Sequence, residues 1–264
     1  MKTVDFAGWS GCIELRSGQA RLVVTTAVGP RIIGVFVGKS PNLVWVDPKT
    51  AGRTGGKDWR LYGGHRLWHS PEAKPRSYAP DNTAIKTARN EHGFVFCGGT
   101  EPSTGIHKSF AIKPLGHEAF RITHQLHNDT LWPVELAAWA LTVMAPGGVA
   151  VVPQPKGDPK ALLPNRYVTV WPYTNMADTR LTWGRDFILL RQDPSATGPC
   201  KFGLNGEYGW LAYANQGAAL VKHYPHFVDA KYPDNGCSIE CYTNSDMLEI
   251  ETLSPLYLLE PGET

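Results

Sequence analysis

The sequence lacks any apolar run of the roughly 18 residues that a membrane-spanning helix needs. Residues 1–6 also lack the apolar core of a secretory signal. The five cysteines are odd in number and scattered, which is typical of a reducing compartment. On a strand, the α-carbons of Cys237 and Cys241 would lie about 13 Å apart, too far for a disulfide. We therefore expect a cytoplasmic protein that has no membrane partner.

Basic runs and stripes are also missing. The chain has 26 Lys and Arg against 24 Asp and Glu, and both signs are spread along its length. Nucleic-acid-binding proteins gather positive charge on one face, so we expect no nucleic-acid partner. The sequence contains no GxGxxG, GxxxxGK[ST] or GxSxG pattern, which argues against the common phosphate-binding loops and against a nucleophile elbow.

Metal-binding patterns are scarce. No CxxC spacing is present, and the histidine pairs considered as metal ligands are His65 with His69 and His223 with His226. Neither pair comes with a committed carboxylate, and nearby Gly and Pro residues disfavour the helix that would bring either pair together. We expect no metal and no cofactor.

The chain is instead rich in short strand-like runs. It has 27 Gly and 21 Pro, and no convincing amphipathic helix interrupts the pattern. The clearest runs are residues 13–15, 20–26, 32–37, 43–46, 94–97, 107–112, 119–127, 134–144, 149–152, 187–191, 208–215, 218–223, 238–243 and 247–254. Many strands without βαβ alternation predict an all-β antiparallel sandwich or barrel.

A single domain spanning residues 1–264 is expected, because the sequence shows no internal repeat and no linker. An apolar content of 42% is enough for a sizeable core. The stretches 47–60, 70–92 and 153–166 contain few apolar residues and are predicted to be long loops, which are often functional in a compact domain.

Residues 62–72, Tyr-Gly-Gly-His-Arg-Leu-Trp-His-Ser-Pro-Glu, hold the densest chemistry. A core strand would be apolar, so this mixture predicts a loop. In one interpretation the loop belongs to a concave site, where Trp68 stacks on a polar ring and Arg66 and Glu72 form hydrogen bonds. In the other, its aromatic side chains simply plug one end of a β-sandwich.

Acidic residues alternate near the C-terminus. Period-two alternation places Glu249 and Glu251 on one face of the predicted strand 247–254. A turn at 244–246 would pair this strand with 238–243 and bring Glu240 to the same face. Repulsion among the three acids would raise at least one pKa unless a cation lies nearby. One of them can serve as a general base, and the alternative is a solvated strand face.

A third candidate surface lies on residues 134–139. Alternation puts Glu135 and Trp139 on one face of this predicted strand. Trp139 is then either a stacking platform for a sugar ring or simply a core residue.

Three segments together resemble a known superfamily. They are residues 63–68 (Gly-Gly-His-Arg-Leu-Trp), 128–144, and 248–253 (Leu-Glu-Ile-Glu-Thr-Leu), in that order. Over most of its length the chain resembles the galactose mutarotase-like superfamily of aldose 1-epimerases, and it is most similar to an uncharacterised bacterial branch. The resemblance implies a large antiparallel β-supersandwich that holds a sugar or oligosaccharide substrate on its concave sheet.

The resemblance also implies catalytic roles. The family's Glu-Thr motif matches Glu251 and Thr252, so Glu251 inherits the role of base on the anomeric hydroxyl. The histidine that protonates the ring oxygen should fall near residues 140–142, where this chain has Leu141. An epimerase would then need a substitute acid; the candidates are His65, His69 and His223, and His65 is the first choice. Further substrate contacts are expected from Arg66, Trp68, His69, Glu135, Trp139, His223 and Glu240.

Two other functions stay open on the same fold. Loss of the family histidine favours a non-catalytic sugar-binding protein. A glycan lyase or glycoside hydrolase is the other alternative. A hydrolase needs two carboxylates about 5–10 Å apart, which Glu251 can form with Glu135 or Glu240.

Overall fold

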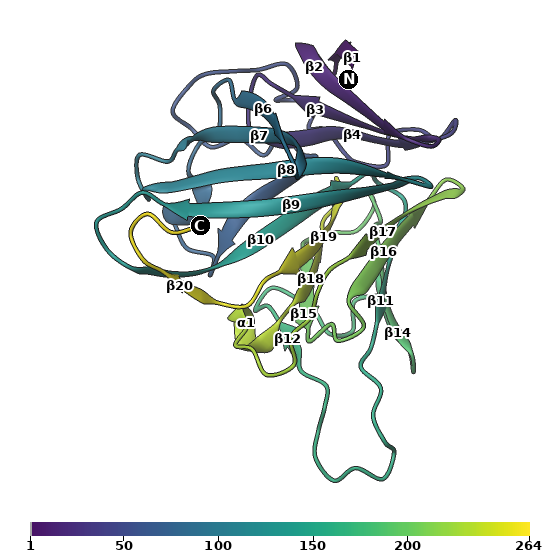
Figure 1. The fold of residues 1–264 in the computed structure, drawn as a ribbon. Helices are drawn as coiled ribbons and strands as arrows, with labels where there is room; N and C mark the ends of the chain where they lie inside the picture. The colour runs from purple at the N-terminus through teal and green to yellow at the C-terminus, as the bar shows by residue number, and fades with distance from the viewer. Residues whose placement is uncertain (1) are drawn as a thin grey trace. The chain divides into compact units, whose positions relative to one another are not determined.

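The computed structural model describes residues 2–264 and is built almost entirely of strands. Strands account for 49% of the chain and helices for 3%, so the all-β prediction is confirmed. Contacts between α-carbons divide the chain into two compact units, one reaching Thr142 and including Tyr257–Thr264, the other Val143–Leu256 (Figure 1). The expectation of a single domain stays a prediction.

The first unit contains two antiparallel sheets. One has the order β1 (Lys2–Phe6), β2 (Trp9–Ser17), β3 (Ala20–Thr25), β4 (Arg31–Val37), β5 (His65–Ser70) and β10 (Val134–Met144), with β20 (Tyr257–Leu259) pairing the start of β10. The other has the order β6 (Lys86–Asn90), β7 (Gly93–Thr100), β8 (Ile106–Gly116) and β9 (Ala119–Asn128). A single 3₁₀ turn, η1 (Arg76–Tyr78), follows β5.

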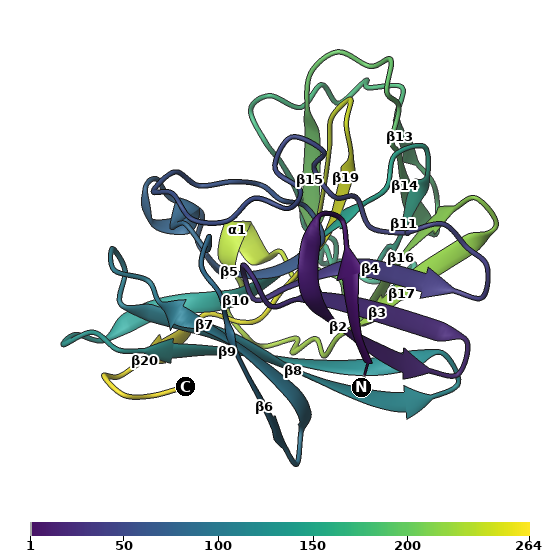
Figure 2. The same ribbon diagram turned by 90° about the horizontal axis from the view of Figure 1, so that it is seen from above.

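The core of the first unit lies between these two sheets. Alternation in β2–β4 turns Leu15, Leu22 and Ile32 toward Phe96 and Phe110 of β7 and β8, and all five side chains are buried. Figure 2 shows β7–β9 lying against β2–β4. A second buried cluster covers other side chains of β2–β4 with residues that include Tyr62, so apolar side chains of these strands are buried on both faces.

The second unit also contains two groups of antiparallel strands. One has the order β12 (Val168–Val170), β15 (Cys200–Leu204), β18 (Ile239–Thr243) and β19 (Leu248–Leu253). The other has the order β13 (Leu181–Trp183), β14 (Phe187–Arg191), β11 (Val149–Pro153), β16 (Trp210–Asn215) and β17 (Ala218–His223). The short segment α1 (Pro233–Gly236) is a turn, because Asp234 and Asn235 have left-handed backbone angles.

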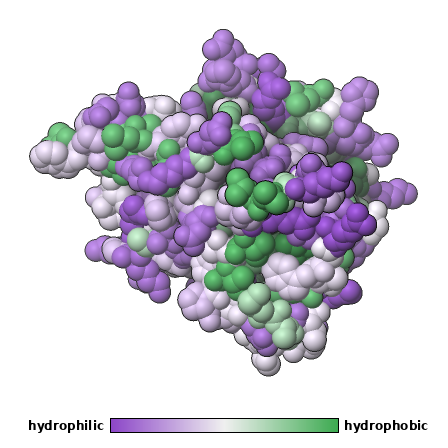
Figure 3. All heavy atoms as spheres, turned by 90° about the horizontal axis from the view of Figure 1, so that it is seen from below, coloured by the Kyte–Doolittle hydropathy of each residue, from purple (hydrophilic) through white to green (hydrophobic). Residues whose placement is uncertain are grey.

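Hydrophobic and hydrophilic residues are mixed on the face drawn in Figure 3. Two of the most exposed apolar side chains of the second unit are Leu162 and Leu163, in the long segment between β11 and β12. No helix within residues 2–264 is long and apolar enough to cross a membrane.

Most of the predicted strands form, but one central strand contradicts the sequence reasoning. Residues 134–144, 187–191 and 218–223 form β10, β14 and β17 with the expected bounds, whereas 43–46 makes only isolated bridges. Residues 65–70, predicted to be a loop, are the fully buried strand β5. The prediction was wrong because the polar side chains of β5 find buried partners. Strands β1, β6, β12, β13, β15 and β20 were not predicted at all.

Candidate functional site

Two glycines set the start of β5. Tyr62, Gly63 and Gly64 have successive φ angles of 54°, 83° and 71°. A Cβ atom on Gly63 would lie 2.2 Å from the carbonyl oxygen of Trp45, and one on Gly64 would lie 2.2 Å from that of Ile32. Only glycine fits this combination of left-handed backbone and close approach. The Gly-Gly pair therefore specifies where the chain enters β5.

A buried arginine holds the same turn. The Arg31 guanidinium donates hydrogen bonds to the carbonyl oxygens of Leu61 at 3.1 Å and Gly63 at 2.7 Å. It also forms an ion pair with Asp81 at 2.7 Å. Burial lowers the pKa of Arg31 although Asp81 opposes the shift. The arginine thus fixes the backbone before β5 from the side of β4.

Alternation along β5 separates the predicted site residues into two sets. Leu67 packs with Ile106, Leu126 and Leu136 in the core beneath the second sheet of the unit. Its period-two neighbours His65 and His69 share that inward face. Arg66 and Trp68 lie on the opposite face of the strand. The sequence therefore places its histidines and its stacking residues on different sides of the sheet.

Both inward histidines are engaged in buried polar networks. The ring nitrogens of His65 lie 2.8 Å from Oγ1 of Thr142 and 2.8 Å from Nε2 of His124. His69 Nε2 lies 3.3 Å from a carboxylate oxygen of Glu101, which also forms an ion pair with Lys108. These contacts give each imidazole a structural role in the layer between the sheets.

The outward face of β5 carries an aromatic cluster. The Trp68 ring contacts those of Trp59, Tyr78 and Trp139 at centroid distances of 5.8, 5.3 and 5.4 Å. The Arg66 guanidinium lies 4.5 Å from the Trp68 ring, in cation–π geometry. The rings of Trp68 and Trp139 are buried and those of Trp59 and Tyr78 are only partly exposed, so the cluster packs chiefly against itself and Trp139 is a core residue.

The neighbouring strand β10 contributes side chains to the outward face that Arg66 and Trp68 occupy on β5. Trp139 pairs with Trp68, and Leu141 pairs with Arg66. The apolar residue at the expected histidine position therefore lies directly opposite the arginine. Glu135 belongs to the exposed beginning of β10, opposite Leu258 of β20.

In the second unit, the hairpin β18–β19 forms as predicted and brings two acids together. Glu240 pairs directly with Glu251 across the hairpin, and both side chains are fully buried. The ammonium of Lys201 on β15 lies 2.6 Å from Glu240 and 3.2 Å from Glu251. One buried cation thus serves two buried carboxylates.

The electrostatics of this cluster favour one shared proton. Burial raises the pKa of Glu240 well above its usual value, and the Lys201 ammonium only partly opposes the shift. Burial disfavours the charge on Lys201, but the carboxylates of Glu251 and Glu240 outweigh that effect and raise its pKa. A protonated Glu240 beside a charged Lys201 is the arrangement consistent with both shifts.

A second lysine lies close to the hairpin. The Lys222 ammonium donates a hydrogen bond to the carbonyl oxygen of Ile250 at 3.3 Å. Burial lowers the pKa of Lys222 to about 7, with the Glu251 carboxylate opposing the shift. The adjacent His223, a predicted site residue, lies at the exposed end of β17 opposite Trp210.

Aromatic side chains border the Lys201 cluster. The Lys201 ammonium lies 4.5 Å from the centre of the Trp171 ring. Tyr173, which is 45% exposed, packs edge-on against Tyr242 of β18. Thr174 ties this segment to β15, because its hydroxyl both donates to the carbonyl oxygen of Lys201 and accepts from its N–H. The second unit therefore holds acids, a cation and partly exposed rings in one place.

Searches against protein-family models and against curated proteins found no match. Solved structures do match the fold. A galactose mutarotase-like protein from Lactobacillus casei ATCC 334 is 8% identical, with a TM-score of 0.51 and 96% of each chain covered. The chain has the galactose mutarotase-like fold. A protein from Synechocystis sp. PCC 6803 is 9% identical, with a TM-score of 0.59, 100% of this chain and 96% of that chain covered. An Escherichia coli K12 protein whose proposed activity is aldose 1-epimerase is 12% identical, with a TM-score of 0.50, 96% of this chain and 94% of that chain covered.

Within this galactose mutarotase-like fold, several site residues escaped the sequence reasoning. Lys201, Trp171 and Tyr173 come from stretches that carry no motif. Only the isolated lysine in the apolar run Cys200–Leu204 offered a signal, since a lysine inside a strand needs a partner. No three His, Cys, Asp or Glu side chains among residues 2–264 gather as metal ligands.

Proposed function

We propose that the protein is a carbohydrate-active enzyme of the aldose 1-epimerase type, with Glu251 as its base. The observation that carries the proposal is the buried Glu240–Lys201–Glu251 cluster beside Trp171 and Tyr173. The galactose mutarotase-like fold supports a carbohydrate-related function. Acid and base groups next to aromatic rings are what ring opening of a sugar requires.

In this mechanism Glu251 takes the proton of the anomeric hydroxyl. The C1–O5 bond breaks as the ring oxygen accepts a proton from the Glu240 carboxyl, and an open-chain aldehyde forms. Rotation about the C1–C2 bond exposes the other carbonyl face. Reclosure returns the ring-oxygen proton to Glu240, and the new anomeric oxygen takes the proton held by Glu251. The Lys201 ammonium, 2.6 Å from Glu240 and 3.2 Å from Glu251, stabilises the Glu240 carboxylate after it has given up its proton.

Glu240 replaces His65 as the acid in this proposal. The His65 imidazole lies on the inward face of β5, and both of its nitrogens have partners within 2.8 Å. It therefore has no ring nitrogen left to donate a proton to a substrate. Leu141 is apolar and cannot supply a proton, whereas burial raises the pKa of Glu240 well above its usual value, which favours the protonated form that an acid needs.

A substrate must reach two carboxylates that have no exposed surface. The partly exposed side of the cluster is the one bordered by Trp171 and Tyr173. We infer that these rings shift to receive a sugar and then stack on its apolar face. The hydrogen bonds of Thr174 to β15 keep the segment anchored while its side chains move.

Hydrolysis of a glycosidic bond is a second candidate, favoured by one observation. Both carboxyl groups bind the same nitrogen at 2.6 and 3.2 Å, so those two oxygens lie less than about 6 Å apart, close to the separation in retaining glycosidases. A retaining hydrolase would use Glu251 as nucleophile and Glu240 as acid. It would release a new reducing end, whereas an epimerase causes no net reaction.

Magnetisation-transfer NMR on neutral, acidic and 6-phospho aldoses tests the proposal. Wild type is measured beside Glu251→Gln, Glu240→Gln and His65→Ala, with the exposed Glu91→Gln as a control for loss of one carboxylate. We expect anomer exchange above the spontaneous rate, lost by about 100-fold or more in both cluster variants and kept in the control and in folded His65→Ala.

Each other outcome has a defined meaning. No acceleration for any sugar overturns the epimerase. Line broadening of a sugar without exchange then indicates a binding protein, and new reducing ends from an oligosaccharide indicate the hydrolase. Loss of exchange in folded His65→Ala, with Glu240→Gln active, returns the acid role to the histidine.

A further inference from the structure

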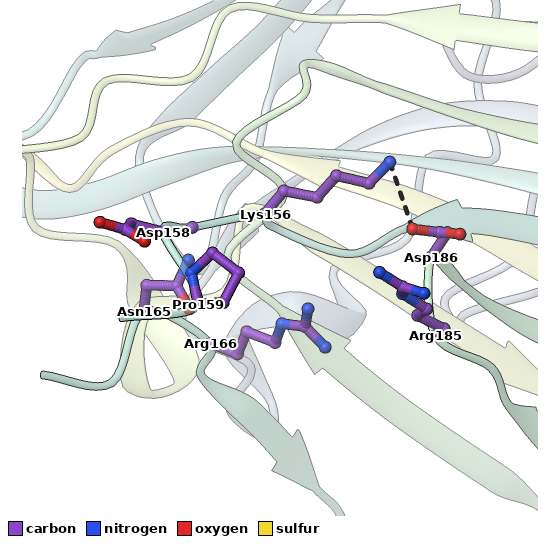
Figure 4. Close-up of a pocket in the computed structure, with 8 residues that line it drawn as sticks. Lys156, Asp158, Pro159, Asn165, Arg166, Arg185 and Asp186 are labelled. Atoms are coloured by element: carbon purple, nitrogen blue, oxygen red, sulfur yellow. Dashed lines mark ion pairs between the residues drawn. The ribbon is translucent and has the colours of Figure 1, made fainter. Parts of the chain in front are cut away.

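A polar cleft of about 410 Å³ lies in the second unit, apart from the carboxylate cluster. It forms between the long segment that joins β11 to β12 and the turn that joins β13 to β14. Its charged and amide side chains are those of Lys156, Asp158, Asn165, Arg166, Arg185 and Asp186. Figure 4 shows the guanidinium groups of Arg166 and Arg185 and the ammonium of Lys156 around one space.

The two walls of the cleft are tied together by backbone and side-chain contacts. Gln154 is buried, and its N–H donates to the carbonyl oxygen of Asp186 at 3.0 Å. Its side-chain amide also donates to the carbonyl oxygen of Gly184. On the opposite wall, Asn165 is held through its carbonyl oxygen by the side chain of Asn205 at 3.0 Å. The cleft is therefore attached to the sheet framework on both sides.

Neither arginine in the cleft is neutralised by a carboxylate. Arg166 donates only to neutral acceptors, the carbonyl oxygen of Pro155 at 2.9 Å and the side-chain oxygen of Gln154 at 3.2 Å. These bonds use Nε and Nη1 and leave Nη2 available. Arg185 makes no hydrogen bond or ion pair with any residue from 2 to 264. Both arginines are exposed and solvated by water, so an anion that enters the cleft can take the place of that water on two guanidinium groups at once.

The two acids of the cleft have other partners. Asp186 pairs with Lys156 at 3.2 Å. Asp158 accepts a hydrogen bond from the N–H of Lys160 at 2.9 Å, which folds its carboxylate back onto its own loop. After these pairings the cleft keeps the charge of two guanidiniums against one acid. Its field therefore favours an anionic ligand.

We propose that this cleft binds an oxyanion substituent, a carboxylate, sulfate or phosphate, carried by a sugar. Guanidinium forks match the paired oxygens of all three groups. The cleft volume leaves room for the sugar that bears the charge. The site is separate from the Glu251 chemistry, so the protein would bind acidic sugars there even if it catalysed nothing.

Side-chain NMR of the arginine Nε–Hε groups tests the site directly. Glucuronate and glucose 6-phosphate are titrated into the full chain, with glucose as the neutral probe and inorganic phosphate as the free anion. We expect the Arg166 and Arg185 signals to shift with both charged sugars and to stay in place with glucose. Affinity should fall as salt is raised, because the cleft is open to solvent.

Two sets of variants distinguish anion binding in the cleft from attraction by the overall positive charge of the protein. Arg166→Ala combined with Arg185→Ala should raise the dissociation constant for glucuronate by about tenfold or more. The matched control replaces Arg191 and Lys39 by Ala, which removes the same charge from exposed positions outside the cleft, and should change it less than about twofold. Arg166→Lys should weaken binding too, since an ammonium cannot bind two oxygens side by side.

The proposal would be overturned if the cleft and control variants weakened glucuronate binding equally. It would also be overturned if no anion shifted the NMR signals of Arg166 and Arg185. Binding of inorganic phosphate as tight as that of glucose 6-phosphate, and lost in the double variant, would overturn the sugar part and assign the cleft to a free oxyanion. Anomer exchange measured on the same double variant reports on Glu251 separately, because the cleft arginines lie outside the carboxylate cluster.

Discussion

Glu240 and Glu251 face each other across the β18–β19 hairpin and share a single cation, the ammonium of Lys201, at 2.6 and 3.2 Å. All three side chains are nearly or fully buried. Such an arrangement is stable only while the charges are matched, so the lysine and one proton must balance the two acids. The cluster is consequently both the proposed catalytic centre and a sensitive point for folding.

Replacing Lys201 by Met should destabilise the protein by about 3–5 kcal/mol, because an uncompensated carboxylate is then buried. Urea unfolding at pH 7 measures the loss. Lys201→Met combined with Glu251→Gln should recover part of it, since the double variant no longer buries the carboxylate that has lost its cation. A single variant as stable as wild type would show that Glu251 does not depend on this lysine.

Glu101 predicts loss of stability in acid. Burial alone would raise its pKa, but the hydrogen bond from His69 and the charge of Lys108 lower it to about 2. A folded-state pKa below the unfolded value contributes stability above the unfolded pKa of 4.5, and this contribution disappears as the pH falls toward 2. The contribution amounts to about 3 kcal/mol at neutral pH.

Unfolding of wild type and of Glu101→Gln at pH 6 and pH 3 checks this. The variant should lose much less stability between the two values than wild type does. Equal losses in the two proteins would mean that other acids cause the pH dependence.

The β18–β19 hairpin shows what the sequence could predict. Its strands and turn are contiguous, so alternation alone placed Glu240 beside Glu251. Strand β5 shows what it could not. The partners that satisfy His65 and His69 come from Thr142, His124 and Glu101, which are 32 to 77 positions away in the chain. When those partners are unknown, a polar segment such as β5 is predicted to be a loop. Lys201 is likewise far in sequence from Glu240 and Glu251, so the sequence did not indicate that it would pair with them.

The backbone before β5 predicts a strong position dependence for Gly→Ala substitutions. Gly64 and Gly55 have similar φ angles of 71° and 65°, but a Cβ on Gly64 would lie 2.2 Å from the Ile32 carbonyl oxygen, and one on Gly55 would have nothing within 4 Å. Gly55→Ala should therefore cost only the left-handed backbone penalty, about 1–2 kcal/mol. Gly64→Ala should cost clearly more, or prevent folding.

Thermal unfolding of the two variants, with yield of folded protein as a second readout, compares these costs. Similar melting temperatures would mean that the turn relaxes around the added methyl group. The left-handed φ angles alone would then explain why glycine occupies positions 63 and 64.

The buried Lys222 predicts a second rise of stability with pH, this time in the alkaline range. Burial lowers its pKa from 10.5 in the unfolded chain to about 7 in the folded one. Between these values the unfolded chain binds more protons, so the free energy of unfolding should rise with pH, by a few kcal/mol in total. Lys222→Met should flatten this rise, and the exposed Lys39→Met should keep it. Denaturant unfolding at pH 7, 8.5 and 10 makes the comparison. A wild type that loses stability steadily over this range, in parallel with Lys222→Met, would show that the ammonium stays charged in the fold, held by the neighbouring Glu251 more strongly than burial opposes it.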